Sequence, residues 1–415
     1  MTTTPIAVPR LVARTVEVAD PGPLLDLLPA DEVMTWLRRG EGFVAWGVAA
    51  QCRTSTESRF SDASTWWRNV VRVAAVADEV EVPGTGLVCL GSFAFADTPG
   101  DSVLTIPKVV VGRRGDRFWV TSIGASADEL PTPVPQPRPE APVNLAFADG
   151  ALSGAEWEGV VWEAVLHLNA GELDKVVLAR DLIATADAPI DVRWPLRRLG
   201  SEYEMCWTFH VDGLFGATPE LLVRREKGLV TSRVLAGTIR RTGDDEHDLT
   251  LAATLARSSK DLEEHEYAVR SVADALAPYC SSMNVPEAPF VLHLPNVMHL
   301  ATDVAGVVDD GGGASVLDLA SALHPSAAVG GTPTKLAVEM IAEIEGMDRG
   351  RYAGPVGWMN AHGDGEFGIA LRSAELDGAR VRLFAGCGIV ADSDPESELA
   401  EAQAKFVPVR DALSS

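Results

Sequence analysis

The sequence predicts an α+β protein built on antiparallel β-sheets. Runs rich in β-branched and aromatic residues follow one another, with glycines and charged turns between them, as at 42–50, 86–96, 102–114 and 116–124. The GRRGD turn at 112–116 joins the last two runs as an antiparallel hairpin. Helical segments stand between groups of strands instead of alternating with single strands, which favours α+β over a parallel α/β fold.

The composition is that of a globular protein and excludes several functions. The 415-residue chain has 47% hydrophobic and 23% charged residues, so it can bury a sizeable core in one large or two ordinary domains. Its net charge of −24 argues against a nucleic-acid partner, because phosphates attract a basic surface. No apolar run has the length of a membrane span, and the opening MTTTPIAVPRLVARTV lacks the apolar stretch of a signal peptide. Five scattered cysteines without a CxxC pair indicate reduced thiols in the cytoplasm, with neither disulfides nor a zinc site.

A proline-rich linker divides the chain. Prolines recur at nearly every second position of LPTPVPQPRPE (130–140), which favours an extended segment outside any sheet. We therefore expect residues 1–129 to be an N-terminal, strand-rich portion of the fold, 130–142 to be the linker and 150–412 to be the main region. One helix is expected in the first portion, at Ser64–Val76.

Caps and hydrophobic periodicity mark the elements beyond the linker. Ser153 and Glu156 form a capping box that opens a helix, and Asp394 followed by Pro395 caps the last helix. The other expected elements are a strand after Lys175, two hairpins within 203–241, a helix at 261–277, a further segment at 293–308, helices near 315–323 and 332–345, a strand pair at 354–376 and a last strand at 380–390.

Lys175 and Glu220 are candidates for acid and base chemistry. Lys175 stands at the mouth of the buried run Val176–Leu178 and shares a face with Val177 and Ala179. It is either an amine held in a site or a rim lysine that reaches water. Glu220 ends the turn FGATPE and would place its carboxylate at a strand end, although a solvated turn glutamate fits the same pattern.

Two helices carry acidic residues at helical spacing. Asp261 and Glu264 share one face of the segment KDLEEHE, and carboxylate oxygens are ligands that magnesium prefers. An acidic helix start favoured by the helix dipole is the alternative. On the last helix Glu398, Glu401 and Lys405 share a face, where a plain surface ion pair would contribute only ~0.3–0.5 kcal/mol.

Three glycine motifs could let a ligand approach the backbone. They are LAGT (235–238), HPSAAVGG (324–331) and FAGCGIV (384–390). Exposed amides in such motifs can hold carboxylates, but each motif could equally be a bend in a sheet.

Ten short motifs occur along the chain in an order that is typical of one enzyme family. They are DKVVLAR, FGATPE, LAGT, KDLEEHE, HLAT, HPSAAVGG, YAGPVGW, ALRSAEL, FAGCGIV and ESELAEAQAK. Over residues 150–412 the chain resembles the chorismate-binding enzymes, and among them the isochorismate synthases most closely. The resemblance implies the fold of anthranilate synthase component I, in which two stacked antiparallel β-sheets are flanked by helices. It also implies an active site at one end of the sandwich and Mg²⁺ as the cofactor.

The resemblance implies a reversible conversion of chorismate to isochorismate. Lys175 would activate water for attack on ring carbon 2, and Glu220 would protonate the hydroxyl that leaves carbon 4. Glu264 and Glu401 would hold Mg²⁺, which binds the ring carboxylate.

Further positions follow from the same resemblance. Asp261 and Glu398, one turn earlier on each helix, would support the metal. Tyr352 and Arg372 would face the enolpyruvyl carboxylate of chorismate. The remaining substrate-binding positions are Gly237, Thr238, His299, Ala328, Gly386 and Lys405.

Particular residues separate this chain from related activities. Anthranilate synthases lack a lysine at the position of Lys175, and aminodeoxychorismate synthases carry a lysine nucleophile at the position of Ala236. Salicylate synthases share Lys175 and Glu220, so salicylate formation by loss of pyruvate from isochorismate remains the alternative. Those enzymes tend to have a polar, β-branched residue where this chain has Ala328. A chorismate-binding relative without catalysis is less favoured, because the catalytic residues are retained.

The expected partner is therefore the small molecule chorismate, with no nucleic acid and no membrane. The resemblance favours a monomer. Menaquinone and siderophore biosynthesis both use this reaction, and the residues leave both open.

Overall fold

The computed structural model describes residues 8–414 apart from 128, 294–296 and 309–312, and the side chains of Thr238, Lys260 and Glu264 also lie outside the description. The helices are α1 (Arg59–Val73), α2 (Gly154–Asn169), α3 (Arg193–Glu202), α4 (Asp245–Leu255), α5 (Ser259–Leu276), α6 (Val316–Leu323), α7 (Thr334–Ile344) and α8 (Pro395–Leu413), with short 3-10 helices at Leu24–Leu27 and Ala277–Tyr279. The strands are β1 (Val12–Val18), β2 (Val33–Arg38), β3 (Glu41–Thr54), β4 (Ala75–Asp78), β5 (Val88–Ser92), β6 (Ser102–Arg114), β7 (Arg117–Gly124), β8 (Ala146–Asp149), β9 (Lys175–Thr185), β10 (Trp207–Val211), β11 (Leu214–Thr218), β12 (Leu221–Glu226), β13 (Leu229–Arg240), β14 (Cys280–Asn284), β15 (Phe290–His293), β16 (Val297–Val308), β17 (Gly331–Thr332), β18 (Pro355–Asn360), β19 (Gly365–Ile369), β20 (Ser373–Asp377) and β21 (Arg380–Ile389).

The strands form one hydrogen-bonded network with two arms, joined at the long pair β3–β6. One arm runs through β4, β1, β7, β6, β3, β2, β10, β11, β20, β21 and β9, and β9 also pairs with β8 and β17. The other arm runs from β6 through β5, β18, β19, β12, β13 and β16, and β16 also pairs with β14 and β15. Among these pairs β1–β4 is parallel and the others are antiparallel. The predicted α+β class is confirmed, and the two expected sheets are continuous with each other through β3 and β6.

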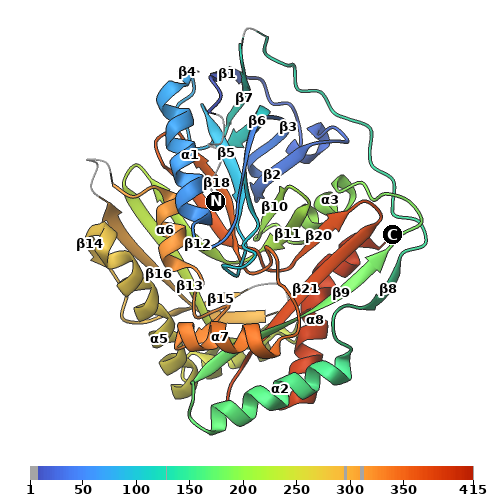
Figure 1. Ribbon diagram of the computed structural model, residues 1–415, viewed down its shortest axis with the longest axis vertical. Helices are drawn as coiled ribbons and strands as arrows, with labels where there is room; N and C mark the ends of the chain where they lie inside the picture. The colour runs from blue at the N-terminus through green and yellow to red at the C-terminus, as the bar shows by residue number, and fades with distance from the viewer. Residues whose placement is uncertain (1–7, 128, 294–296, 309–312, 415) are drawn as a thin grey trace.

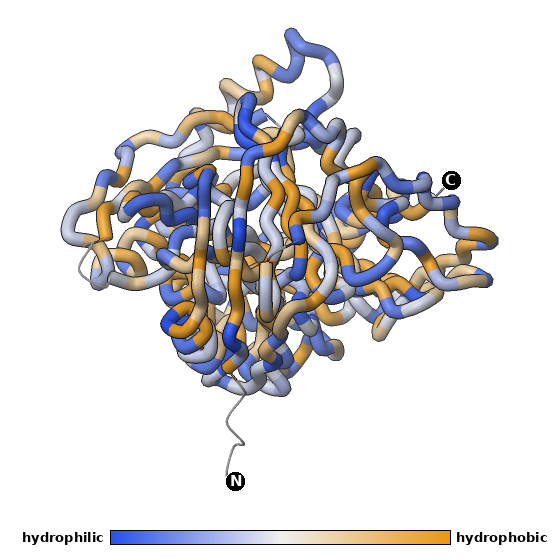
Figure 2. Tube along the Cα trace, turned by 90° about the horizontal axis from the view of Figure 1, so that it is seen from above, coloured by the Kyte–Doolittle hydropathy of each residue, from blue (hydrophilic) through white to orange (hydrophobic). Residues whose placement is uncertain are grey.

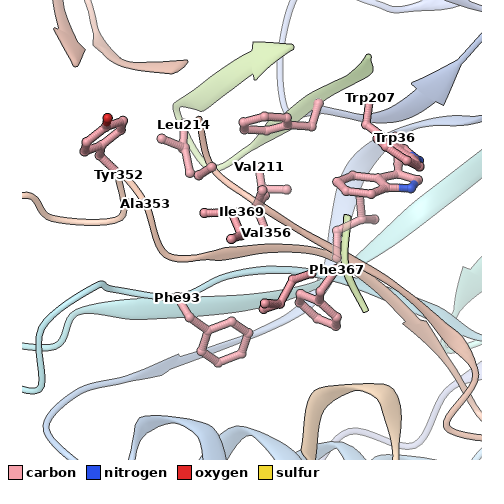
Figure 3. Close-up of a cluster of buried hydrophobic side chains, with 14 of the residues drawn as sticks. Trp36, Phe93, Trp207, Val211, Leu214, Tyr352, Ala353, Val356, Phe367 and Ile369 are labelled. Carbon is pink, nitrogen blue, oxygen red and sulfur yellow. The ribbon is translucent and has the colours of Figure 1, made fainter. Parts of the chain in front are cut away.

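Apolar side chains from the two arms pack face to face. Figure 3 shows Trp36 and Leu214 of the first arm in one cluster with Val356 and Phe367 of the second. Close packing is visible at Gly368, where an added Cβ would lie 3.3 Å from the Trp36 ring. The sandwich core therefore contains strands from both ends of the chain.

Helices cover the outer faces of the sandwich (Figure 1). α2 and α8 pack together beside β9 and β21, and α7 lies against β9. α5 packs on β13 and β16, while α1 lies beside α6. The strand that begins with Lys175 is thus backed by α2 and α7.

The proline-rich segment crosses the outside of the molecule. Residues 129–142 contain no helix or strand and run from β7 towards β8 (Figure 1). The amide of Gln136 donates to the Asp26 carbonyl at 2.7 Å, and Arg193 Nη1 donates to the Pro137 carbonyl at 3.3 Å. These bonds fix the segment against the 3-10 helix at Leu24–Leu27 and against α3.

Both predicted helix caps are confirmed. Ser153 and Glu156 form the expected reciprocal capping box, and the Asp394 side chain accepts from the Ser397 amide at 2.9 Å. The bounds predicted for the first helix, Ser64–Val76, were wrong, because the helix spans Arg59–Val73. It starts earlier because Phe60 is buried and stacks on Phe93, with ring centroids 4.5 Å apart, and it ends earlier because β4 pairs with β1.

Hydrophobic and hydrophilic residues are interleaved along the chain (Figure 2). Among the described residues, no helix combines the length and the apolar character needed to cross a membrane. All five cysteines are free thiols, as their spacing predicted.

Candidate active site

Lys175 begins β9, and its side chain lies across the neighbouring strand β21. β21 pairs antiparallel with β9 so that Gly388 is opposite Val177. An added Cβ at Gly388 would lie 2.7 Å from Lys175 Cε and 3.3 Å from Nζ. The second glycine of FAGCGIV therefore leaves the room that the lysine side chain occupies, which is a close approach that only glycine permits.

Glu220 lies in the turn between β11 and β12. Its backbone amide donates to Thr218 Oγ1 at 3.2 Å, and its carbonyl accepts from the Ile369 amide at 3.1 Å. Only 8% of the residue is exposed. Burial raises the pKa of Glu220 to about 7, although the nearby charges of Arg372 and Lys175 act to lower it. The structure thus brings three predicted site residues, from three separate segments, within electrostatic reach of one another.

Arg372 adopts a backbone conformation that is unusual for a residue with a side chain. It lies between β19 and β20 with φ of +47°. Its carbonyl accepts from the Ala217 amide at 3.2 Å, and an added Cβ at Gly216 would approach that carbonyl oxygen to 2.5 Å. Strained conformations of this kind persist where the surroundings hold them, and they concentrate at functional sites. Here the strain accompanies a cation that acts on the neighbouring ionisable groups.

Tyr352 is a buried phenol beside β21. Its ring stacks on Phe384 at 5.0 Å between centroids with an interplanar angle of 8°, and an added Cβ at Gly386 would lie 3.1 Å from the Tyr352 hydroxyl. Burial raises the pKa of Tyr352 to about 12, with Arg349 and Arg372 acting in the opposite direction. The phenol therefore remains protonated and can donate a hydrogen bond to a carboxylate.

His299 lies on β16 opposite a bulge in β13. The bulge interrupts the register between Ala236 and Thr238, and Gly237 within it has φ of +76°. Burial lowers the pKa of His299 to about 4, and the positive charges of Arg372 and Lys405 lower it further. The imidazole is consequently neutral near pH 7. The side chain of Thr238 lies outside the described residues.

Glu398, Glu401 and Lys405 meet at the first turns of α8, as their spacing predicted. Lys405 Nζ contacts Glu401 Oε1 at 2.6 Å and donates to the Gly386 carbonyl at 2.8 Å. Ser393 Oγ donates to Glu398 Oε1 at 2.7 Å. Oxygen atoms of the two glutamates and Cys387 Sγ all lie within 4.8 Å of one another.

The donor set on α8 fits a hard divalent cation. Burial raises the pKa of Glu398, and the negative charge of Glu401 adds to this effect. Burial also acts to raise the pKa of Glu401, but Lys405, Arg372 and Arg240 outweigh it and lower the pKa. A divalent cation would relieve the repulsion between the two carboxylates. Burial raises the pKa of the Cys387 thiol to about 12, so the thiol is a poor ligand for magnesium.

α5 brings Asp261 close to the bulge in β13. Asp261 lies in its first turn, capped by Ser258, and an added Cβ at Gly237 would lie 3.2 Å from Asp261 Cβ. Glu264 is one turn further along the helix, but its side chain falls outside the described residues. The metal role of Glu264 therefore stays a prediction.

Ala328 lies half-buried in the loop between α6 and β17. This loop is bonded to the lysine strand, because the Val177 amide donates to the Gly330 carbonyl at 2.9 Å and Thr332 pairs with Lys175. The loop thus belongs to the same region, while the contact of Ala328 with substrate stays a prediction.

Sequence reasoning missed a buried ion pair behind this site. Glu345 and Arg349 lie beneath the lysine strand, and their side chains are 0% and 2% exposed. Their spacing of four residues was a signal for an ion pair, but periodicity did not reveal that the pair is buried. Sequence reasoning also missed Arg240, whose charge acts on Glu401.

Two cavities lie elsewhere in the molecule. Their volumes are about 410 and 450 Å³, and strands β2, β3 and β10 contribute to their walls. Among the predicted site residues whose side chains are described, none lines either cavity. The candidate site is therefore recognised by its converging polar side chains.

Residues 29–414 match the family described as chorismate binding enzyme. This match covers most of the chain, including each predicted site residue and every strand of the two arms except β1. The chain belongs to the chorismate-binding enzyme family.

The names of similar proteins are more specific than the family description. The salicylate biosynthesis isochorismate synthase of Pseudomonas aeruginosa is 34% identical over 98% of this chain and 91% of its own length. Isochorismate synthase MenF of Bacillus subtilis is 36% identical over 75% of this chain, and this match spans 66% of that protein. The solved structure of MenF, the menaquinone-specific isochorismate synthase from Escherichia coli, has a TM-score of 0.81 and 25% identity, covering 100% of this chain and 97% of that one.

Proposed function

We propose that the protein is an isochorismate synthase that exchanges the hydroxyl on ring carbon 4 of chorismate for a water-derived hydroxyl on ring carbon 2. The observation that carries this proposal is Glu220, a buried carboxyl with a pKa of about 7 that interacts with Lys175 and Arg372. The names of the most similar relatives support the same activity.

The exchange needs one proton removed and one delivered. Lys175, in its neutral form, takes a proton from the attacking water, and Glu220 gives a proton to the departing hydroxyl. A carboxyl with a pKa near 7 is a suitable acid at neutral pH, because a substantial fraction is protonated while its conjugate base remains weak. Both groups regain their starting states when the reaction runs in reverse.

The two carboxylates of chorismate need positive or hydrogen-bonding partners in this acidic protein. Arg372 and the phenol of Tyr352 supply them for the enolpyruvyl carboxylate, and Lys405 adds a further cation. We propose that Glu264 and Glu401 hold Mg²⁺, supported by Asp261 and Glu398, and that the ion neutralises the ring carboxylate when bound. The neutral His299 and the amides near Gly237 and Gly386 complete the lining.

The small apolar Ala328 favours release of isochorismate. Salicylate formation requires that the enolpyruvyl group be fixed for a second step, the elimination of pyruvate. Alanine offers no side-chain hydrogen bond for that purpose, and a missing hydrogen bond changes a barrier by only ~1 kcal/mol. Traces of salicylate are therefore compatible with the proposal.

Chromatography of a reaction containing chorismate, Mg²⁺ and enzyme tests the function. Isochorismate should accumulate until it reaches equilibrium with chorismate, and Lys175→Ala should stop the reaction while chorismate still raises the melting temperature. Salicylate and pyruvate as the main products from the earliest times would identify a salicylate synthase. Chorismate that raises the melting temperature of the unmodified protein but is never consumed would identify a non-catalytic binding protein.

A further inference from the structure

The strand that carries Lys175 has a gap in its strand pairing. One edge of β9 pairs with β21 along most of its length. The other edge pairs with β17 at Lys175–Val176 and with β8 at Leu182–Thr185. Between these two partners, the backbone groups of Val177 and Ala179 face no strand among the described residues.

Glu345 and Arg349 fill this gap with side chains. Glu345 Oε2 accepts from the Ala179 amide at 2.8 Å, and Arg349 Nη2 donates to the Val177 carbonyl at 2.7 Å. The pair thus supplies one acceptor and one donor at the places where a neighbouring strand would supply them. Glu345 and Arg349 also hold each other, through Nε–Oε1 at 2.7 Å and Nη2–Oε2 at 2.6 Å.

The same arginine fixes the loop that contains Ala328. Arg349 Nη1 donates to the Val329 carbonyl at 2.9 Å, and the guanidinium lies 4.2 Å from the centroid of the Phe95 ring. The Arg349 carbonyl accepts from the Tyr352 amide at 3.0 Å. The side chain of Arg349 therefore connects the lysine strand and the loop, and its backbone carbonyl holds the segment that leads to Tyr352.

We propose that Glu345 and Arg349 are positioning residues, which take the place of a missing strand and hold the Lys175 amine and the 326–331 loop in catalytic register. This inference rests on the proposed function, because it assigns the pair a role in placing the base. A reacting group displaced by about 1 Å can lose about a hundredfold in rate, so a conservative change beneath the strand should act on turnover.

The test compares Arg349→Lys with Arg382→Lys. Arg382 is a matched control, because its Nε donates to Asp181 Oδ2 at 2.6 Å and Asp181 also lies on β9. Lysine keeps the charge at either position but cannot make the forked contacts of a guanidinium. Three quantities are measured for each variant: the kinetic constants for chorismate, the melting temperature and amide hydrogen exchange over 174–181 and 326–331.

Arg349→Lys should lower kcat by about tenfold or more while KM stays within about threefold, the pattern of an interaction that acts on the transition state. Exchange should quicken at Val177, Ala179 and residues 326–331. Arg382→Lys should keep kcat within about twofold of the value for the unmodified protein, even if its melting temperature falls by as much as that of Arg349→Lys. If Arg349→Lys does not fold, Glu345→Gln, which preserves shape and one acceptor, is held to the same criteria.

Two results would overturn the inference. One is unchanged kcat in Arg349→Lys, and the other is an equal loss of kcat in Arg382→Lys. If the unmodified protein leaves chorismate unchanged, the proposed function fails by itself. Hydrogen exchange then tests whether Glu345 and Arg349 take the place of a missing strand. Unaltered exchange in Arg349→Lys contradicts this role, and faster exchange confined to the two measured segments supports it.

Discussion

Glu220 makes the folded protein sensitive to pH. Its pKa rises from the ordinary 4.5 to about 7 because burial disfavours the charged form. Between these two values the folded state binds a proton that the unfolded chain has released. The free energy of unfolding therefore falls as the pH rises from 4.5 to about 7. Above about pH 7 this contribution of Glu220 to stability is lost completely.

Glu220→Gln should stabilise the protein at high pH. The expected gain in the free energy of unfolding is on the order of 3 kcal/mol at about pH 8 and vanishes at about pH 4.5, because the amide carries no charge to bury. Urea unfolding at both pH values measures it. Glu163→Gln, on the exposed face of α2, is the control and should show no such difference. An equal effect of Glu220→Gln at both pH values would contradict the raised pKa.

Gly388→Ala should impair turnover with little effect on stability. The new methyl group would meet the flexible end of Lys175 at 2.7 Å, so the amine moves while the backbone stays in place. We expect kcat to fall by about tenfold or more, with a shift of at most a few degrees in melting temperature. Gly159→Ala on α2, where an added Cβ meets nothing within 4 Å, should leave kcat unchanged. Full activity of Gly388→Ala would show that Lys175 acts from another position.

The proximity of site residues was predictable where each residue stands in a recognised motif, while their roles stay predictions. Lys175, Glu220 and Arg372 stand in motifs, and the structure brings them together. Glu345 and Arg349 could not be found in this way, because their importance depends on a gap in strand pairing that exists only in the folded chain. The positive φ of Arg372 could not be read from the sequence either, and its carbonyl accepts a hydrogen bond from Ala217 on β11, far away in sequence.

At the scale of elements, α8 brings together Glu398 and Glu401, two of the acidic side chains proposed to bind or support Mg²⁺. Mg²⁺ should raise the melting temperature of the unmodified protein, and Glu401→Gln should abolish most of that rise and most of the activity. Glu396→Gln, at an exposed position in the first turn of the same helix, should retain both. Full turnover in excess EDTA would refute a magnesium requirement.

Caps made some helix starts predictable, but two of the helices were not anticipated. The capping box of α2 and the aspartate before α8 mark their starts in the sequence. α3 lacks a side-chain cap and was not anticipated. α4 has an Asp244 cap, but it was hidden among neighbouring charges in TGDDEHD. Propensity alone is a weak guide in such segments, because packing decides their structure.

For the whole molecule, the pairing of strands adjacent in sequence was predictable, whereas the pairing of strands far apart in sequence was not. The β6–β7 hairpin follows from its turn. The pairing of β5 with β18 joins residues near 90 to residues near 358, and no local signal encodes it. The same holds for the junction at β3 and β6, where one long strand pair serves both arms. The family resemblance supplied the sandwich, but not the continuity between its layers.

The two parts of the chain that the segment 129–142 joins are also held together by strand pairing. Strands on either side of this crossing share hydrogen bonds in both arms, through β2–β10 and β5–β18. A single cut in the crossing would therefore leave two polypeptides interlocked as a complex, each completing sheets of the other. Either piece made alone would expose unpaired strand edges, which invite aggregation. Covalent continuity here serves assembly, because it keeps the two pieces at high effective concentration while they find each other.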